Sequence, residues 1–426
     1  MPFGEDTVSS VIGRQTFFVK PTGNIVLKDR GKQVLKTLDG LQRFAASFGY
    51  RPDFYVRSPG RINLIGEHID YCGGLVMPMA IGQATHGWYG FNGTSLIRIF
   101  SERFNELAVI NPLDVMSGAS GHWSDYSQGL LRFSAHRKLG RGFDVYLTSD
   151  ISAGGLSSSA SLLALLSLVD HHALTGQIIP LADQSERLRL AMLCQRVENA
   201  YVGVPSGIMD PASVLLGEIM TLSCQTLKYQ RLAPISHDYR LVIMDTQVPR
   251  TLAGSGYAAR VAEVRAIEAV LRSAVPRGGL AQCPPTERDD HLLRLSDPVL
   301  KRRAQHIFDE QQRVILAADA LNRLDMAGLG ALMNQSHRSL SADYEVSCPE
   351  LDLVCELSVQ SGYSLGARMT GAGFGGCAIS LVDAKNVEAH AEFVSAQYQR
   401  QTGLKPVVQS CEPSVGTEIT LLSEKS

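Results

Sequence analysis

The chain has 426 residues, and its 40 Lys and Arg against 42 Asp and Glu give a formal net charge of -2. A near-neutral chain lacks the positive charge that broad nucleic-acid binding or a polybasic membrane contact requires. Hydrophobic residues make up 45% and charged residues 19%, which supports a large core, and the longest apolar run, at 162–169, is too short to span a membrane. We therefore expect partners that are neither nucleic acid nor membrane.

The eight cysteines form no C-x-x-C pair, and most of them sit inside apolar runs. This pattern is typical of reduced thiols in the core of a cytosolic protein. The first residues, MPFGED, show no basic region followed by an apolar stretch, so no secretory signal is expected. Both observations predict a cytoplasmic location.

Hydrophobic spacing predicts the main elements in chain order. These are a helix at 31–48, a strand at 54–57 leading into Ser58-Pro59-Gly60, strands near 95–110 and 143–149, helices at 157–175 and 183–200, a strand at 241–245, a helix at 256–273, a loop at 274–285, helices at 299–324 and 326–340, and a strand at 377–382. Strands mixed with helix pairs, without regular βαβ alternation, predict α+β layers in two lobes. We expect an N-terminal lobe at 1–225 and a C-terminal lobe at 226–426.

A glycine-bearing segment, SAGGLSSSAS at 152–161, follows a predicted strand and opens an apolar helix. Glycine lets the backbone approach a ligand closely, and a helix start offers free N–H groups and the positive dipole end, which suit a phosphate. Serine hydroxyls there can also reach a metal ion. The alternative is an ordinary turn with Ser157 or Ser158 as N-cap. No G-K-[ST] follows, so the segment is not a Walker loop.

The segment RSPGRINLIGEHIDY at 57–71 concentrates ionisable side chains among apolar ones. They include Arg61, Glu67, His68 and Asp70. Burying so many polar groups is costly without partners, and a polyol supplies partners because hydroxyls both donate and accept. The alternative is a surface turn with an internal Arg–Glu salt bridge.

A third glycine segment, MTGAGFGGC at 369–377, matches G-x-G-x-x-G. A predicted strand follows it rather than a helix, and no βαβ unit surrounds it, so a dinucleotide-binding fold is rejected. We interpret it as a glycine loop that lets another segment or a ligand lie close. A plain hairpin turn is the alternative.

Two carboxylates complete the candidate set. Glu198 lies at the end of the helix predicted at 183–200, and Asp210 follows a glycine- and proline-rich stretch. Asp210 before Pro211 also suits an N-cap followed by proline at the first helical position. For Glu198 the alternative is an exposed helical carboxylate, which its position in a helix favours when the residue is considered alone.

Together and in this order, these segments resemble the sugar kinases of the GHMP superfamily, and the galactokinase family in particular, from about Phe54 to Val382. GRINLIGEHIDY is similar to the galactokinase signature, GGLSSSAS to the superfamily's ATP-phosphate motif, and TGAGFGGC to its third motif. VENAYVGVPSGIMD, NQSHRS and YEVSCPEL match as well. The resemblance implies an α+β, two-lobed GHMP kinase fold with the active site in the cleft between the lobes.

The resemblance also implies an activity and a role for each matching residue. Galactokinases phosphorylate the anomeric hydroxyl of α-D-galactose with ATP and Mg²⁺. Asp210 matches the family's proton acceptor and Arg61 its transition-state stabiliser. The sugar contacts match Arg61, Glu67, His68, Asp70, Asp210 and Tyr257; the ATP phosphate loop matches Ala153, Gly154, Gly155, Leu156, Ser157, Ser158 and Ser159; and the Mg²⁺ positions match Ser159 and Glu198.

Elementary chemistry agrees with these roles. Phosphoryl transfer is mostly positioning and charge neutralisation. Mg²⁺ takes one or two protein oxygens besides phosphates, so one carboxylate and one hydroxyl suffice. An aspartate beside the sugar hydroxyl can accept its proton, which contributes roughly 10²–10⁴ in rate.

Some residues beside the expected sugar pocket depart from the family pattern. Ile69, Pro211 and the stretch 247–251 differ from its usual residues. A kinase for N-acetylgalactosamine, galacturonate or arabinose therefore stays open, as does a non-catalytic galactose and ATP sensor that regulates transcription. The sequence predicts neither the oligomeric state nor the adenine pocket, for which Trp123 and Tyr126 are candidates, although an aromatic pair also suits a core.

Overall fold

The computed structural model describes residues 29–115, 118–134, 141–152, 155–249 and 253–422. Residues 1–51 and 52–426 form two separate compact units. In the first unit the structure describes residues 29–51, which include helix α1 (Asp29–Phe48) and confirm the helix predicted at 31–48. The ring of Phe44 packs against that of Phe48 in the same helix and against that of Tyr50 just after it, at centroid distances of 4.9 and 5.2 Å.

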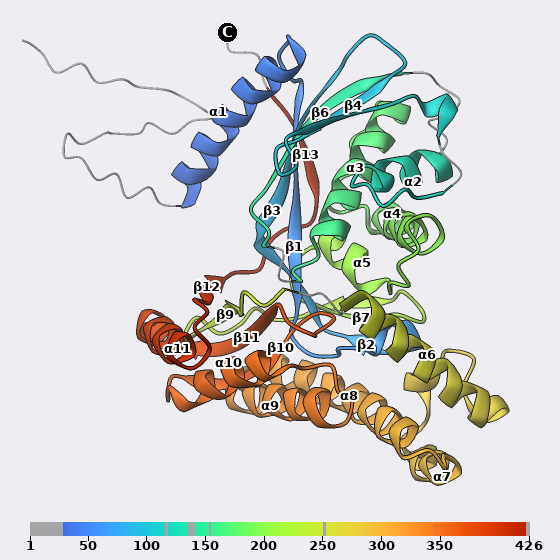
Figure 1. Cartoon of the computed structure of the whole chain (residues 1–426), viewed down its shortest axis with the longest axis vertical. Coiled ribbons are helices and arrows are strands. Elements are labelled where there is room, and N and C mark those ends of the chain that lie inside the picture. Colours follow the sequence, from blue (N-terminus) through green and yellow to red (C-terminus); the bar gives the residue numbers. More distant parts are fainter. Residues whose placement is uncertain (1–28, 116–117, 135–140, 153–154, 250–252, 423–426) are drawn as a thin grey trace, which may run out of the picture. The chain divides into compact units, whose positions relative to one another are not determined.

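The second unit contains a six-stranded sheet in the order β13-β1-β3-β6-β4-β5 (Figure 1). Its strands are β1 (Phe54–Asn63), β3 (Pro78–Phe91), β4 (Ile97–Ser101), β5 (Glu106–Ile110), β6 (Phe143–Ser149) and β13 (Glu418–Leu421). Neighbouring strands run antiparallel except β4 and β6, which are parallel. The strands predicted near 95–110 and 143–149 are confirmed, and the last strand of the chain completes the sheet beside β1.

Strand β1 is longer than the prediction of a strand at 54–57. It continues through Ser58-Pro59-Gly60 to Asn63, with a register shift against β3 between Pro59 and Arg61. The irregularity accommodates proline, which has no N–H for the ladder. At Gly60 a Cβ would lie 2.8 Å from the carbonyl oxygen of Leu156, so glycine permits this close approach. The bulge thereby brings Arg61 against the segment that precedes α3.

Two smaller sheets lie in the same unit. One has the order β10-β11-β9-β12 and the other β2-β7-β8, and both are antiparallel throughout. Their strands are β2 (Leu75–Val76), β7 (Met220–Ser223), β8 (Tyr229–Arg231), β9 (Tyr239–Asp245), β10 (Ser364–Met369), β11 (Cys377–Asp383) and β12 (Val407–Cys411). The strands predicted at 241–245 and 377–382 are confirmed as β9 and β11.

Helices cover these sheets. They are α2 (Asp125–Phe133), α3 (Ser158–Thr175), α4 (Gln184–Val197), α5 (Met209–Leu216), α6 (Ala253–Leu271), α7 (Arg288–Arg294), α8 (Pro298–Asn322), α9 (Met326–Ala342), α10 (Pro349–Gln360) and α11 (Val387–Thr402). Helix α3 is largely buried and packs on β1 and β3, with α2, α4 and α5 beside it, whereas α9 and α10 pack on β10 (Figure 1). The helices predicted from 157 to 340 are confirmed, and the mixture of layers is the predicted α+β class.

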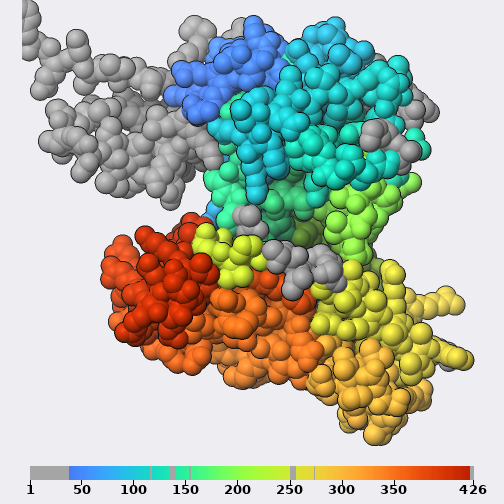
Figure 2. Space-filling model, viewed as in Figure 1, coloured from blue at the N-terminus to red at the C-terminus, as the bar shows by residue number. Residues whose placement is uncertain are grey.

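Figure 2 shows that, on the visible face, atoms coloured cyan to green and atoms coloured yellow to red gather in separate regions. The predicted lobe boundary between residues 225 and 226 stays a prediction. Among the described residues, no helix is both long and apolar enough to cross a membrane. All eight cysteines are free, and six of them are buried.

Candidate active site

A cavity of about 550 Å³ collects nearly all of the predicted site residues. Those that line it are Arg61, Glu67, His68, Asp70, Gly155, Ser157, Ser158, Ser159, Glu198, Asp210 and Tyr257. Leu156 is buried in the core, and its carbonyl oxygen accepts the N–H of Arg61 at 3.1 Å. Ala153 and Gly154 lie outside the described residues. Segments that are distant in sequence therefore meet at one cavity.

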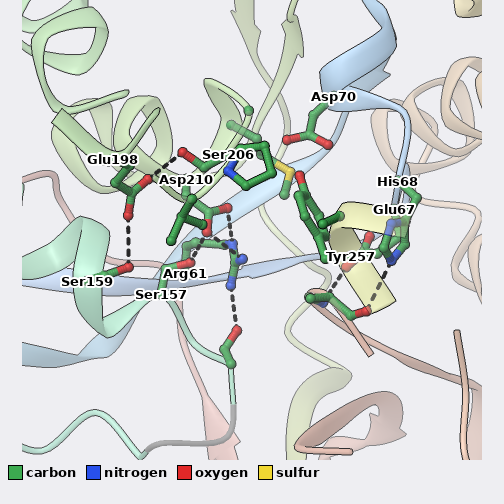
Figure 3. Close-up of a pocket in the computed structure, with 18 of the residues that line it drawn as sticks. Arg61, Glu67, His68, Asp70, Ser157, Ser159, Glu198, Ser206, Asp210 and Tyr257 are labelled. Carbon is green, nitrogen blue, oxygen red and sulfur yellow. Dashed lines mark hydrogen bonds and ion pairs between the residues drawn. The ribbon is translucent and has the colours of Figure 1, made fainter. Parts of the chain in front are cut away.

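Asp210 is held at the cavity wall by two partners. Arg61 donates through Nε to Oδ1 and through Nη2 to Oδ2, both at 2.8 Å, and the Ser157 hydroxyl donates to Oδ2. Arg61 also donates through Nη1 to the carbonyl oxygen of Gly155 at 2.7 Å (Figure 3). The N-cap interpretation of Asp210 is wrong, because Ile208 occupies that position and Asp210 lies inside the first turn of α5. Its carboxylate is thus available to the cavity, with 28% of its side chain exposed.

The start of α3 departs from an ordinary cap. Ser157 adopts a left-handed conformation, with φ 60°, and its side chain makes no capping hydrogen bond. A serine in this region is uncommon, and such strain persists where the surroundings enforce it. Here the backbone turn sends the Ser157 hydroxyl to Asp210 and leaves Ser158 and Ser159 on the cavity wall at the positive end of the helix. Ser157 therefore occupies the predicted N-cap position, but its side chain does not cap the helix.

Glu198 lies where α4 gives way to a π-helical turn, Glu198–Val202, a feature that is common at functional sites. Ser159 Oγ donates to Oε1 at 3.0 Å and Ser206 Oγ donates to Oε2 at 2.6 Å (Figure 3). The residue is only 5% exposed, so the interpretation as an exposed helical carboxylate is wrong. Burial raises the pKa of this carboxyl, and the Ser206 hydroxyl works against that rise.

This oxygen cluster fits Mg²⁺. One carboxylate and serine hydroxyls are hard donors, and a buried carboxylate at a cavity wall gains from a cation. Among the described residues no group of three or more His, Cys, Asp or Glu could hold a metal, so a metal here would take its other ligands from water and phosphate. Ser206 was not predicted, and the only local signal for it is its place in the glycine- and proline-rich stretch before Asp210.

Glu67 differs from Asp210 because its carboxylate is already saturated. Arg368 Nη1 and Asn63 Nδ2 donate to Oε2, while Thr370 Oγ1 and the Gly371 N–H donate to Oε1 at 3.1 and 2.7 Å. The Arg368 contact measures 3.0 Å, and both side chains are at most 2% exposed. Burial raises the pKa of Glu67, and Arg368 opposes the rise. The predicted internal Arg–Glu turn is wrong, since the partner arginine comes from β10.

His68 and Tyr257 form an aromatic part of the same wall. The His68 ring lies 5.6 Å from that of Tyr257, and its Nε2 lies 3.2 Å from the carbonyl oxygen of Ala372. The backbone of His68 is left-handed, with φ 63°. Burial lowers the pKa of His68 to about 3, so the ring is neutral at physiological pH.

Asp70 faces the same cavity from the short helical turn that follows His68. A Cβ at Gly207 would lie 1.8 Å from its Oδ2, so a larger residue there would displace the Asp70 carboxylate. Burial first, and Asp210 second, raise the pKa of Asp70 to about 7. This carboxyl therefore changes charge near neutral pH.

The third glycine segment forms the hairpin loop between β10 and β11. Its Gly371 N–H binds Glu67, and its Ala372 carbonyl oxygen faces His68. The interpretations as a hairpin turn and as a loop that lets another segment lie close are both confirmed. The loop joins the β10–β11 sheet to the segment that follows β1.

A second cavity of about 170 Å³ shares Ser158 and Ser159 with the first. Phe104, Trp123 and Tyr126 line it, and the rings of Phe104 and Trp123 stack at 5.9 Å with an interplanar angle of 7°. An apolar, aromatic-lined space therefore adjoins the start of α3. Trp123 and Tyr126 are the two residues predicted as candidates for the adenine pocket, whereas Phe104 was not predicted.

Comparison with family models finds three matches along the chain. Residues 42–89 match the galactokinase galactose-binding signature, residues 125–218 the N-terminal domain of GHMP kinases, and residues 317–400 the C-terminal region of GHMP kinases. The first match contains the 57–71 segment and the second contains the α3 start, Glu198 and Asp210.

Curated relatives cover most of the chain. The galactokinase of Lactococcus lactis subsp. lactis is 38% identical over 85% of this chain and 91% of its own length. Those of Lacticaseibacillus paracasei and Streptococcus thermophilus are 36% and 37% identical, over 87% and 89% of this chain and 95% and 98% of their own lengths.

Solved structures agree on the fold. Lactococcus lactis galactokinase in complex with galactose superposes with a TM-score of 0.83 at 36% identity, covering 91% of this chain and all of that one (100%). Mevalonate kinase from Methanococcus jannaschii superposes with a TM-score of 0.59 at 18% identity, over 85% of this chain and 98% of its own, and supports the fold alone.

Proposed function

The chain belongs to the galactokinase family of the GHMP kinases, and from this premise we propose that it transfers the terminal phosphoryl group of ATP to the anomeric hydroxyl of galactose. The observation that carries the proposal is the position of Asp210. It is fixed by Arg61 and Ser157 at a cavity that also contains the family's sugar signature and the Ser159–Glu198 cluster.

Asp210 would accept the proton of the attacking hydroxyl. Arg61 and Ser157 engage three of the about four acceptor sites of this carboxylate, which leaves one site on Oδ1 for a sugar hydroxyl. Arg61 would offset the negative charge that builds up on the transferred group. The same guanidinium thus orients Asp210 and faces the phosphate.

Ser159 and Glu198 would hold Mg²⁺ together with nucleotide phosphates. When bound, the ion neutralises phosphate charge. Ser206 keeps Glu198 directed at Ser159 through its 2.6 Å hydrogen bond. Gly155 and Ser157–Ser159 would lie along the phosphates, and the adjoining aromatic cavity, with Trp123 and Tyr126, would take the adenine.

Asp70, His68 and Tyr257 would contact the sugar, since all three line the cavity near Asp210. Glu67 would act mainly through other groups, because four donors already engage its carboxylate. We further propose the cytoplasm as its location and the division at residues 225 and 226 as its lobe boundary. The free, mostly buried cysteines support the former.

Purified protein with MgATP and a panel of sugars tests the proposal by ADP release. We expect kcat/KM for galactose to exceed that for N-acetylgalactosamine, galacturonate and arabinose. A higher value for another sugar would reassign the substrate while keeping the reaction class. Binding of galactose and ATP without any sugar-dependent ADP release would instead favour a sensor.

A further inference from the structure

A chain of tyrosine hydroxyls runs from the protein interior to His68. The Tyr344 hydroxyl lies 2.8 Å from the Tyr71 hydroxyl, which lies 3.1 Å from His68 Nδ1. Tyr344 is fully buried, and its ring packs against His68 at 5.2 Å and against His306 at 4.5 Å. Neither Tyr71 nor Tyr344 lines the cavity that His68 lines.

The direction of each hydrogen bond follows from the far side of the ring. His68 Nε2 faces the carbonyl oxygen of Ala372 at 3.2 Å, and a carbonyl can only accept. Nε2 must therefore carry the proton. Burial lowers the pKa of His68 to about 3, so the neutral ring carries no second proton and Nδ1 is an acceptor. Tyr71 must then donate to Nδ1, which leaves the Tyr71 oxygen to accept from Tyr344.

We propose that Tyr71 and Tyr344 are positioning residues that fix His68 in the tautomer with the proton on Nε2, directed at the wall of the sugar cavity. The alternative tautomer would set an Nε2 lone pair against the lone pairs of the Ala372 oxygen, which is repulsive. It would also leave the Tyr71 hydrogen without an acceptor on the ring.

The fixed tautomer has a consequence for recognition, which rests on the proposed function. His68 and Ala372 both line the sugar cavity. His68 Nε2–H donates to the Ala372 carbonyl oxygen at 3.2 Å, and this oxygen keeps a second lone pair. A ligand hydroxyl can donate to that lone pair, so the pair favours a hydrogen-bond donor at that position of the ligand.

Histidine NMR on the whole, ligand-free protein tests the tautomer directly. Long-range ¹H–¹⁵N correlation distinguishes a protonated from an unprotonated ring nitrogen, and a His68→Gln variant identifies the signals. We expect Nε2 protonated and Nδ1 unprotonated in the wild type. In Tyr71→Phe the Nδ1 signal should move and the second tautomer should appear. Tyr344→Phe, which removes only the outer link, should give a smaller change in the same direction.

Tyr89→Phe is the matched control. Tyr89 is a buried tyrosine whose hydroxyl is hydrogen-bonded to His172 Nδ1, and neither residue lines the sugar cavity. Its loss should alter the signals of His172 and leave those of His68 in place. A wild-type His68 protonated on Nδ1, or His68 signals unchanged in Tyr71→Phe, would overturn the proposal whatever the enzyme's substrate.

Steady-state kinetics provide the second readout. Loss of one oriented hydrogen bond should raise KM for galactose about 10-fold in Tyr71→Phe, while KM for ATP stays within about 2-fold. An equal rise in both constants would indicate general loss of structure and contradict a positioning role. Inactive wild-type protein would sink the proposed function, but the NMR result would still decide the tautomer.

Discussion

Two arginine–carboxylate pairs lie in this molecule within one site, and they differ in what surrounds them. Arg61 and Asp210 meet at the cavity, with side-chain exposures of 6% and 28%. Glu67 lines the same cavity, but its pair with Arg368 is buried, with side-chain exposures of 2% and 0%. Both Asp210 and Glu67 match positions in the family motifs that are expected to contact the sugar.

This difference shows that the ability of a carboxylate to bind a ligand or accept a proton depends on its free lone pairs, and not on the motif in which the residue lies. Asp210 is oriented from one side by Arg61 and Ser157 and remains open to a ligand. The carboxylate oxygens of Glu67 already accept hydrogen bonds from Asn63, Arg368, Thr370 and Gly371. We therefore expect substitution of the first to alter chemistry and substitution of the second to alter stability.

Asp210→Asn should give the largest effect. The amide keeps the size of the side chain but cannot act as a proton acceptor, so kcat should fall roughly 10²–10⁴-fold while ATP still binds. Stopped assays of ADP formation and calorimetric titration with nucleotide measure the two quantities. Asp144→Asn is the control, because Asp144 is a buried carboxylate bound by Arg98 outside the cavity. Normal turnover in Asp210→Asn would remove this residue from its role.

Glu67→Gln should mainly lower stability. It leaves the buried Arg368 without its countercharge, and breaking a buried pair in this way costs about 3–5 kcal/mol. Urea unfolding measures the loss. Glu186→Gln, which breaks the exposed pair with Arg189, should cost less than about 1 kcal/mol. Equal losses of unfolding free energy in the two variants would contradict the expected difference between a buried and an exposed ion pair.

Ser206→Ala should weaken the metal site without touching Asp210. Glu198 would lose the donor that holds Oε2, and loss of such a supporting contact costs 10–100-fold in metal affinity as an order of magnitude. Mn²⁺ binding in the presence of ATP, followed by electron paramagnetic resonance, is the readout. Ser341→Ala removes a similar serine–carboxylate contact, to Asp352, and should leave metal binding unchanged. Wild-type affinity in Ser206→Ala would contradict the assignment.

Asp70 should make galactose binding pH-dependent. Its pKa is raised to about 7 by burial and by Asp210, so the carboxyl is ionised above pH 7 and protonated below it. An ionised acceptor binds sugar hydroxyls more strongly, so KM for galactose should fall roughly 10-fold as pH rises from 6 to 8. Asp70→Asn should flatten this dependence. A KM that rises with pH, or an unchanged slope in the variant, would refute the role.

Local sequence patterns predicted those candidate site residues that lie together in short motifs. The glycine and serine run at the start of α3 predicted Gly155 and Ser157–Ser159, and the ionisable segment 57–71 predicted Arg61, His68 and Asp70; all of these residues line the cavity. The rejection of a dinucleotide fold also followed from local order, because β11 succeeds the third glycine segment. The long helices were predicted from the spacing of hydrophobic residues, which is also a local pattern.

Long-range pairing explains what the sequence could not predict. Arg368 lies 301 residues from Glu67, and no local spacing links them. Strand β13 pairs with β1 although the two strands are far apart in sequence, and its Glu418–Leu421 run is too short to show a period. Ser157 occupies the predicted N-cap position, but its left-handed backbone and its hydrogen bond to Asp210, 53 residues away, have no signal in the neighbouring sequence.

The most direct test follows the phosphoryl group itself. Protein, MgATP and galactose labelled with ¹³C at the anomeric carbon are incubated, and the product is examined by ¹³C and ³¹P NMR. If Asp210 accepts the proton of the anomeric hydroxyl, we expect a new anomeric signal coupled to phosphorus, which should appear roughly 10²–10⁴-fold more slowly with Asp210→Asn. ADP formation without carbon–phosphorus coupling at the anomeric position, or coupling that persists at full rate in the variant, would contradict the account.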